Sequence, residues 1–360
     1  MSRQKFLKPA LLAGAAVAAI STSAFSADFA KLGKGADIST ICGEKPASVA
    51  MIDGYGGNTW RKIAFAEMKD EASKCPNIKR TVYSDAGGDA QKYNSDINSF
   101  VAQGYDIIMT FADFGDAALP AYRAAMQAGA VVVPYNAKLT GTPGVDYTAN
   151  PHQEMTEVGK EMARWAGTNV KKGNVVFLGG FPGAATSQAI MEGIRDGIKD
   201  YPDLKLLDEN YVVTNWNPAD AQKVVAGLIA KYPQIDVVMS DYGVISLAGI
   251  KAFQQVGLPV PAQTVLASQN DINCKYLADK AAGKGWRYMS LDSTSTIVRF
   301  ALRQGLAAFE GTKLDETTNL VPLTYVDSFK SQDPKCDENA PPDADFTSLL
   351  TQDELMKAIR

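Results

Sequence analysis

Short, mostly apolar segments alternate with longer amphipathic segments along most of the chain. Residues 48–53 (SVAMID) predict a buried strand, which a glycine-rich turn ends. In the helix predicted next, Trp60, Ile63 and Met68 share one face, while charged residues lie on the others. Strand, turn and helix together form one β–α unit.

The same unit recurs in the second half of the chain. Residues 174–178 (NVVFL) predict another buried strand, followed by a glycine-rich turn and a helix over about residues 186–199. A second matching pair begins at residues 105–110 (YDIIMT) and 235–240 (IDVVMS), each followed by polar residues, a helix and a further strand. This matching order predicts two similar halves related by an internal duplication.

Continuous apolar strands that alternate with helices are typical of parallel sheets covered by helices on both faces. We therefore predict two similar, doubly wound α/β domains. Such sheets bind ligands beyond the carboxyl ends of their strands, and in both halves the polar residues gather there. Two facing sets of loops predict a ligand cleft between the domains.

The N-terminus has the layout of a secretory signal peptide. Arg3, Lys5 and Lys8 precede an apolar run at residues 10–20, and small residues follow up to Ala27. The run is shorter than the ~20 residues that a bilayer-spanning helix needs. A buried N-terminal helix is the alternative interpretation. We expect removal of residues 1–26 and a mature protein in the periplasm.

Four cysteines remain after this segment: Cys42, Cys75, Cys274 and Cys336. An exported protein meets an oxidising compartment, where an even number of cysteines indicates disulfides. Of the three possible pairings, the spacing favours Cys42–Cys75 and Cys274–Cys336, one in each half. A metal site is the alternative, but the sequence has a single His and no CxxC motif, so no metal is expected.

Composition narrows the function classes. Hydrophobic residues make up 46% and charged residues 21% of the chain, as in soluble globular proteins, and the length favours two domains. A formal net charge of −4 argues against a nucleic-acid partner. The glycine-rich turns lack the nucleotide-binding fingerprints, so no cofactor is expected. His152 is the only His available as a base for a nucleophile, which argues against an enzyme.

Several motifs resemble the ribose-binding-type (type I) periplasmic sugar-binding proteins of ABC transporters. They are the NTW turn at residues 58–60, the GDAQKYNSDI helix with its GYDIIM strand, the VVVPYN strand, the GGFPGAATSQAIMEGI loop and helix, and the IDVVMSD strand. Their order extends over nearly the whole mature chain. The resemblance implies three hinge crossovers between the domains, near Ala149, Asp292 and Pro322. The domains it implies are an N-terminal one of residues 27–148 and 293–321 and a C-terminal one of residues 149–292 and 322–360.

The resemblance also implies a set of ligand-binding residues. Trp60 and Trp216 match positions where aromatic rings cover the two faces of a sugar, since flat rings desolvate its C–H faces at low entropy cost. Polar partners for the hydroxyl groups are expected among Asn58, Arg61, Asp113, Asn136, Gln188, Asp241, Gln269 or Asn270, and Asp292. Carboxylates and amides suit this role because they exchange strong hydrogen bonds with hydroxyls.

Some of these positions have other interpretations. Helix caps or turns equally account for Asn58, Asp113, Asp241 and Asp292. Ala137 and Gln188 stand where the family usually has arginines, and Arg61 would supply a guanidinium from another direction. Arg61 and Gln188 would otherwise face solvent. These departures leave open whether the ligand is a pentose, a hexose or a related polyol.

The resemblance implies the solute-binding component of an ABC importer, which binds a monosaccharide or polyol and docks on a permease in the inner membrane. The alternative is a sensory binding protein for a small polar signal or an amino sugar, docking on a receptor. A DNA-binding repressor of similar core fold would need a helix-turn-helix where this chain has its signal peptide. We expect a monomer because the hinge must move freely.

Overall fold

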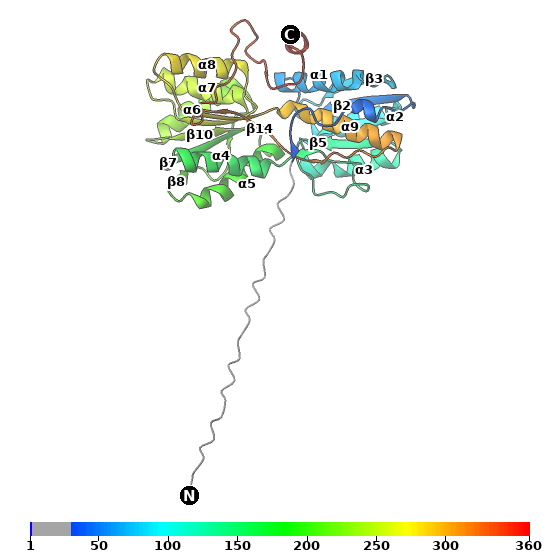
Figure 1. Ribbon diagram of the computed structural model, residues 1–360, viewed down its shortest axis with the longest axis horizontal. Coiled ribbons are helices and arrows are strands. Elements are labelled where there is room, and N and C mark those ends of the chain that lie inside the picture. The colour runs from blue at the N-terminus through cyan, green and yellow to red at the C-terminus, as the bar shows by residue number, and fades with distance from the viewer. Residues whose placement is uncertain (2–29) are drawn as a thin grey trace.

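The computed structural model describes Met1 and residues 30–360, so the expected signal peptide lies outside the described residues. Figure 1 shows two α/β lobes side by side, with the chain passing between them near the centre. In the part of the chain that the structure describes, no helix combines the length and the apolar character needed to cross a membrane.

The first domain is built around a four-stranded parallel sheet of order β3–β2–β4–β5. Its strands are β2 (Ala47–Asp53), β3 (Ile78–Asp85), β4 (Ile107–Phe111) and β5 (Val131–Tyr135). Alternate residues of β2 enter two different apolar cores. One core is covered by α1 (Thr59–Ser73) and α9 (Ile297–Glu310), the other by α2 (Ala90–Ala102) and α3 (Leu119–Gln127). Burial on both faces explains why residues 49–52 of β2 are all apolar.

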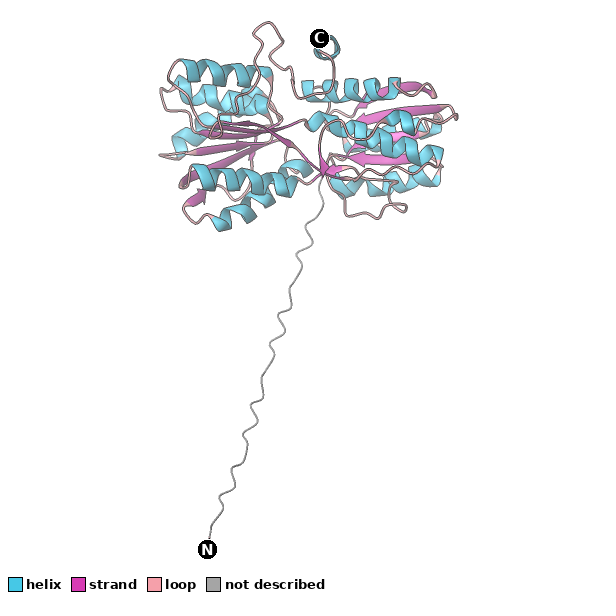
Figure 2. Ribbon diagram, viewed as in Figure 1, coloured by secondary structure: helices cyan, strands magenta, loops and turns pink. Residues whose placement is uncertain are grey.

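The second domain repeats this arrangement with a larger sheet, whose main path is β14–β12–β11–β10–β7–β8. Its strands are β7 (Gly173–Gly179), β8 (Leu204–Leu206), β9 (Val212–Val213), β10 (Val237–Ser240), β11 (Ala262–Leu266), β12 (Tyr288–Asp292) and β14 (Leu323–Asp327). Its helices are α4 (Met155–Asn169) and α5 (Ala185–Gly197) on one face and α6 (Pro218–Lys231), α7 (Gly243–Gln255) and α8 (Asn270–Ala281) on the other. Figure 2 shows helices on both sides of each sheet. The predicted pair of doubly wound domains is confirmed, with β14 as an antiparallel edge strand.

The chain passes between the two sheets after β5, after β12, and between β13 (Asn319–Val321) and β14. At these connections, β13 pairs with β1 (Ala30–Lys31) and β6 (His152–Gln153) in a small parallel sheet. Single turns of 3-10 helix complete the fold at η1 (Ile38–Thr40), η2 (Gly115–Ala118), η3 (Ile198–Asp200) and η4 (Thr294–Thr296). Two of the three crossovers, at β6 and β13, therefore lie side by side in this small sheet.

Both expected disulfides are confirmed. Cys42 pairs with Cys75, which joins the segment before β2 to the end of α1. Cys274 pairs with Cys336, which joins α8 to the C-terminal tail. Each bridge therefore fixes a peripheral segment to the body of one domain.

The C-terminal tail does not stay on the second domain. The sequence placed residues 322–360 there, and β14 and the Cys274–Cys336 bridge do lie on that side. The last helix, α10 (Gln352–Ile359), instead packs on α1 of the first domain, where Leu355 contacts the cluster of Ile63. Leu355 of α10 is buried in this contact with the first domain.

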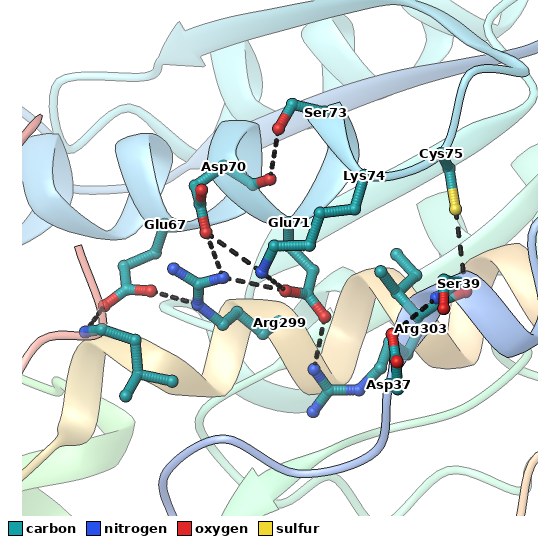
Figure 3. Close-up of polar contacts among 12 residues, drawn as sticks. Asp37, Ser39, Glu67, Asp70, Glu71, Ser73, Lys74, Cys75, Arg299 and Arg303 are labelled. Carbon is teal, nitrogen blue, oxygen red and sulfur yellow. Dashed lines mark hydrogen bonds and ion pairs between the residues drawn. The ribbon is translucent and has the colours of Figure 1, made fainter. Parts of the chain in front are cut away.

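A buried ion network joins α1 to α9, as Figure 3 shows. The guanidinium of Arg299 donates to Glu67, to Asp70 at 2.5 Å and to Glu71 at 2.8 Å. Arg303 donates to Glu71 at 2.7 Å. Removing one partner of a buried ion pair typically costs about 3–5 kcal/mol. The network thus holds α9, which follows the second crossover, firmly against α1.

Candidate functional site

A cavity lies between the two domains at the carboxyl ends of their strands. The first domain contributes Asn58, Trp60, Arg61, Phe111 and Asn136, and the second contributes Thr186, Trp216, Asp241, Tyr242, Leu266 and Ala267. Met155 comes from the start of α4 in the second domain, and the connecting segments add Gln153 and Thr294. The cavity has a volume of about 60 Å³, well above the ~10–15 Å³ that one water needs. Side chains from both halves therefore enclose room for a small polar molecule.

Hydrogen bonds fix the two indoles that line this cavity. Trp60 packs edge-on against Phe111, with ring centroids 5.6 Å apart, and its indole N–H donates to the Thr294 hydroxyl at 2.8 Å. The indole N–H of Trp216 donates to Asp241 at 2.9 Å. Trp216 has a positive φ of 49°, and a Cβ added at Gly180 would lie 2.2 Å from its ring. A glycine is therefore needed beneath this indole.

Asp241 is a buried carboxylate in the cavity wall. It accepts from the indole of Trp216 and from the Ser187 hydroxyl, which lies 2.5 Å away at the start of α5. No Lys, Arg or His among the described residues forms an ion pair with it, and burial raises its pKa to about 6. Its carboxylate does not cap α7, whose N-cap residue is Tyr242. Asp241 is thus a buried hydrogen-bond acceptor in the cavity wall.

Arg61 lines the cavity but is already neutralised. Its guanidinium donates to Asp53 at 3.1 Å and to Asp113 at 2.8 Å, and lies 3.4 Å from the centroid of the Phe111 ring. Asp113 also accepts from the Gly54 N–H at 2.8 Å, and burial raises its pKa to about 6. Asp113 does not itself line the cavity and holds Arg61 from behind. The expected solvent-facing alternative for Arg61 is wrong, because only 4% of this residue is exposed.

Two side-chain amides and a hydroxyl connect the domains along the cavity wall. The Asn136 amide donates to the Thr186 hydroxyl at 3.1 Å, across the cleft. The Gln153 amide, in the crossover strand β6, donates to the Asn136 side-chain oxygen at 2.6 Å. At the mouth of the cleft, Tyr55 and Phe181 stack with centroids 4.3 Å apart. These contacts describe domains that are closed on each other.

Asn58 lines the cavity and also caps α1, accepting from the Arg61 N–H at 3.1 Å. Four other expected ligand residues lie outside the cavity: Gln188, Gln269, Asn270 and Asp292. Gln188 is exposed on α5. The Gln269 amide donates to the Ala267 carbonyl at 2.8 Å, and the Asn270 amide to the Asp337 carbonyl at 2.7 Å. Asp292 is buried and accepts from the Ser268 N–H at 2.6 Å; burial and nearby Asp345 raise its pKa to about 7.

Sequence reasoning did not find several residues that line the cavity: Phe111, Gln153, Met155, Thr186, Tyr242, Leu266, Ala267 and Thr294. Thr186 had a usable signal, because it lies in the first helical turn after a glycine-rich loop. Gln153 had none, since it belongs to a two-residue strand. Within residues 30–360, no group of His, Cys, Asp and Glu is arranged to hold a metal ion.

The chain is similar to known proteins in sequence and in fold. A xylitol-binding protein from Mycolicibacterium smegmatis is 28% identical over 198 residues, which are 54% of this chain and 55% of that protein. The chain thus spans about half the length of this curated relative.

Solved structures show the same fold. The Caulobacter myo-inositol-binding protein bound to myo-inositol is 22% identical, with a TM-score of 0.65 over 79% of this chain and 95% of that one. An ABC transporter periplasmic solute-binding protein from Actinobacillus succinogenes 130z, with bound D-allose, is 18% identical, with a TM-score of 0.65 over 79% and 99%. The family model described as a periplasmic binding protein domain matches residues 49–298. This match spans most of the chain, which therefore belongs to the periplasmic binding protein family.

Proposed function

We propose that the chain binds a neutral monosaccharide or polyol between its domains and delivers it to the permease of an ABC importer in the inner membrane. The observation that carries this proposal is the cavity itself, which two indoles, the Asp241 carboxylate and several amides line from both sides. Relatives named for xylitol, myo-inositol and D-allose support the same ligand class.

The charges around the cavity favour a neutral ligand. Arg61 is the only Lys or Arg among the described lining residues, and two carboxylates already accept from its guanidinium. An anionic ligand would therefore meet no unpaired positive charge. A polyol instead offers hydroxyl donors to Asp241 and C–H faces to the indoles. A buried acceptor left unpaired costs about 1–3 kcal/mol, so a ligand that lacks the matching hydroxyl binds more weakly.

Because the proposed binding residues lie on both domains, ligand binding is linked to closure of the cleft. A ligand that contacts Trp60 and Trp216 at once has its full set of partners only in the closed state, so it shifts the equilibrium towards that state. The permease would then recognise the closed form. Export through a cleaved signal peptide would bring the chain to the periplasm as a monomer.

Thermal unfolding of ligand-stripped protein tests the proposal. The panel contains xylitol, myo-inositol, D-allose and D-arabinose, with gluconate and glucosamine as charged members. A ligand at 100 times its dissociation constant adds ~2.7 kcal/mol of stability, which raises the unfolding midpoint by several degrees. We expect such a shift with a neutral member, its loss in Trp216→Ala, and its retention in Gln188→Ala. No shift with any neutral member would contradict the proposal.

A second candidate is sensory binding of a cationic amino sugar, with docking on a receptor. The carboxylate of Asp241, which has no basic partner among the described residues, favours it. In that case glucosamine would raise the midpoint more than glucose, added to the panel as its neutral counterpart, and Asp241→Asn would abolish this preference.

A further inference from the structure

The C-terminal tail after Cys336 joins the two domains, and we name residues 336–360 the C-terminal strap. On the second domain, its Cys336 is bridged to Cys274 of α8. The backbone N–H groups of Asn270 and Asp271 donate to strap carbonyls, each at 2.9 Å. The first N–H groups of a helix have no partner within it. The strap therefore caps α8 as well as being bonded covalently to it.

On the first domain, the strap binds α1 along its length. The Thr59 hydroxyl, at the first residue of α1, donates to the Asp343 carboxylate at 2.6 Å. The Leu349 N–H donates to Glu67 at 2.7 Å, and Glu67 belongs to the ion network of Figure 3. Figure 1 shows the tail rising from the second domain and ending over α1 of the first. One segment thus holds a helix from each side of the cleft.

The strap also contacts the crossover that follows β12. The Ser293 N–H donates to the Thr347 hydroxyl at 2.8 Å, and the Ser293 hydroxyl donates to the Thr347 carbonyl at 3.2 Å. Ser293 has a positive φ of 64°, a conformation that side chains with a Cβ rarely adopt without support. These two bonds hold the crossover in its turn.

Thr59 and Ser293, two of the residues that the strap holds, are next in sequence to the two residues of the Trp60–Thr294 hydrogen bond. Thr59, which the strap holds through Asp343, immediately precedes Trp60 in α1. Ser293, which the strap holds through Thr347, immediately precedes Thr294, the acceptor of the Trp60 indole N–H. The strap therefore supports both the donor and the acceptor of the hydrogen bond between the Trp60 indole and the Thr294 hydroxyl.

We propose that the C-terminal strap positions Trp60 and restrains opening of the cleft, with Asp343 and Thr347 as positioning residues and the Cys274–Cys336 bridge as its anchor. Opening separates α1 from α8, whereas the strap is bonded to both. A wide opening must then break the Thr59–Asp343 bond or uncap α8. The strap keeps the ligand-free protein closer to its binding-competent geometry, which strengthens apparent affinity in proportion to the competent fraction.

Small-angle X-ray scattering of ligand-free protein tests the restraint without any ligand. The Cys274→Ser, Cys336→Ser double variant should have a larger radius of gyration than the unchanged protein. Cys42→Ser, Cys75→Ser is the matched control, because that bridge lies within the first domain and includes no residue of the strap. Asp343→Ala, Thr347→Val keeps both bridges and should also open the cleft. Equal radii for all four proteins would overturn the proposal, as would expansion in the control alone.

Titration calorimetry with xylitol tests the positioning of Trp60; this readout rests on the proposed function. Asp343→Ala, Thr347→Val should bind on the order of tenfold more weakly, because a tenfold drop in the competent fraction lowers apparent affinity tenfold. The Cys42, Cys75 control should bind as the unchanged protein does. Unchanged affinity in the strap variant would refute the positioning role. If neither xylitol nor any panel member binds the unchanged protein, the proposed function fails, while the scattering result still decides the restraint.

Discussion

Replacing Asp113 with Ala removes one of the two carboxylates that neutralise the buried guanidinium of Arg61. Its two side-chain oxygens accept from Arg61 and from the Gly54 N–H, each at 2.8 Å. Breaking a buried ion pair in this way costs about 3–5 kcal/mol, and the orphaned N–H about 1–3 kcal/mol. The two costs share one site and are not additive. We expect the free energy of unfolding to fall by about 3–5 kcal/mol.

Urea unfolding at pH 7 measures this change. Asp89→Ala is the matched control, because Asp89 is an exposed N-cap of α2 in the same domain, and such a loss costs about 0.5–2 kcal/mol. An Asp113→Ala cost no larger than that of Asp89→Ala would refute a stabilising role for the buried ion pairs of Arg61 with Asp53 and Asp113. The Arg61 side chain would also lose one of its two carboxylate partners. A panel member that raises the unfolding midpoint of the unchanged protein should therefore raise that of the variant less.

Three further predictions use other parts of the structure. Gly180→Ala should displace the indole of Trp216, change intrinsic fluorescence and weaken ligand binding, whereas Gly227→Ala, with open space around its Cβ position, should have none of these effects. Burial raises the pKa of Asp241 from an ordinary 3.8 to about 6. The folded state then binds the extra proton between these values, so urea unfolding should show the unchanged protein losing stability relative to Asp241→Asn as the pH rises from 4 to 6. The two disulfides close loops with sequence separations of 33 and 62 residues, and each should contribute about 3–5 kcal/mol to the free energy of unfolding. Reducing both should therefore lower the unfolding midpoint; an unchanged midpoint would contradict the loop-entropy argument.

The alternation of strands and helices could be predicted because each parallel strand is buried on both faces. Residues 49–52 are all apolar, since alternate side chains enter the two cores on either side of β2. The disulfide pairing was equally accessible, because each bridge stays within one half of the sequence. Both features depend on local pattern and short sequence separation.

The roles of individual polar residues could not be predicted in the same way. Asp113 and Asp241 both follow an apolar strand, yet one lies behind the cavity wall and the other forms part of it. Their difference comes from distant partners: Arg61 covers Asp113, whereas the partners of Asp241 leave it at the cavity. Asn270 likewise carries an amide at the expected strand end, but the strap binds it. Such outcomes depend on contacts between residues far apart in the chain.

The two walls of the cavity are held by different parts of the molecule. Trp216 donates to Asp241 of its own domain, so this wall moves with the second domain as a rigid unit. Trp60 belongs to α1 of the first domain but donates to Thr294, directly after the crossover from β12. Any bending at that crossover therefore acts on the Trp60 indole, whereas the Trp216 indole only follows its domain. A ligand that fixes the Trp60 indole would also fix Thr294 through this hydrogen bond. Occupancy of the cavity would then restrict the conformation of the crossover and, with it, the angle between the domains.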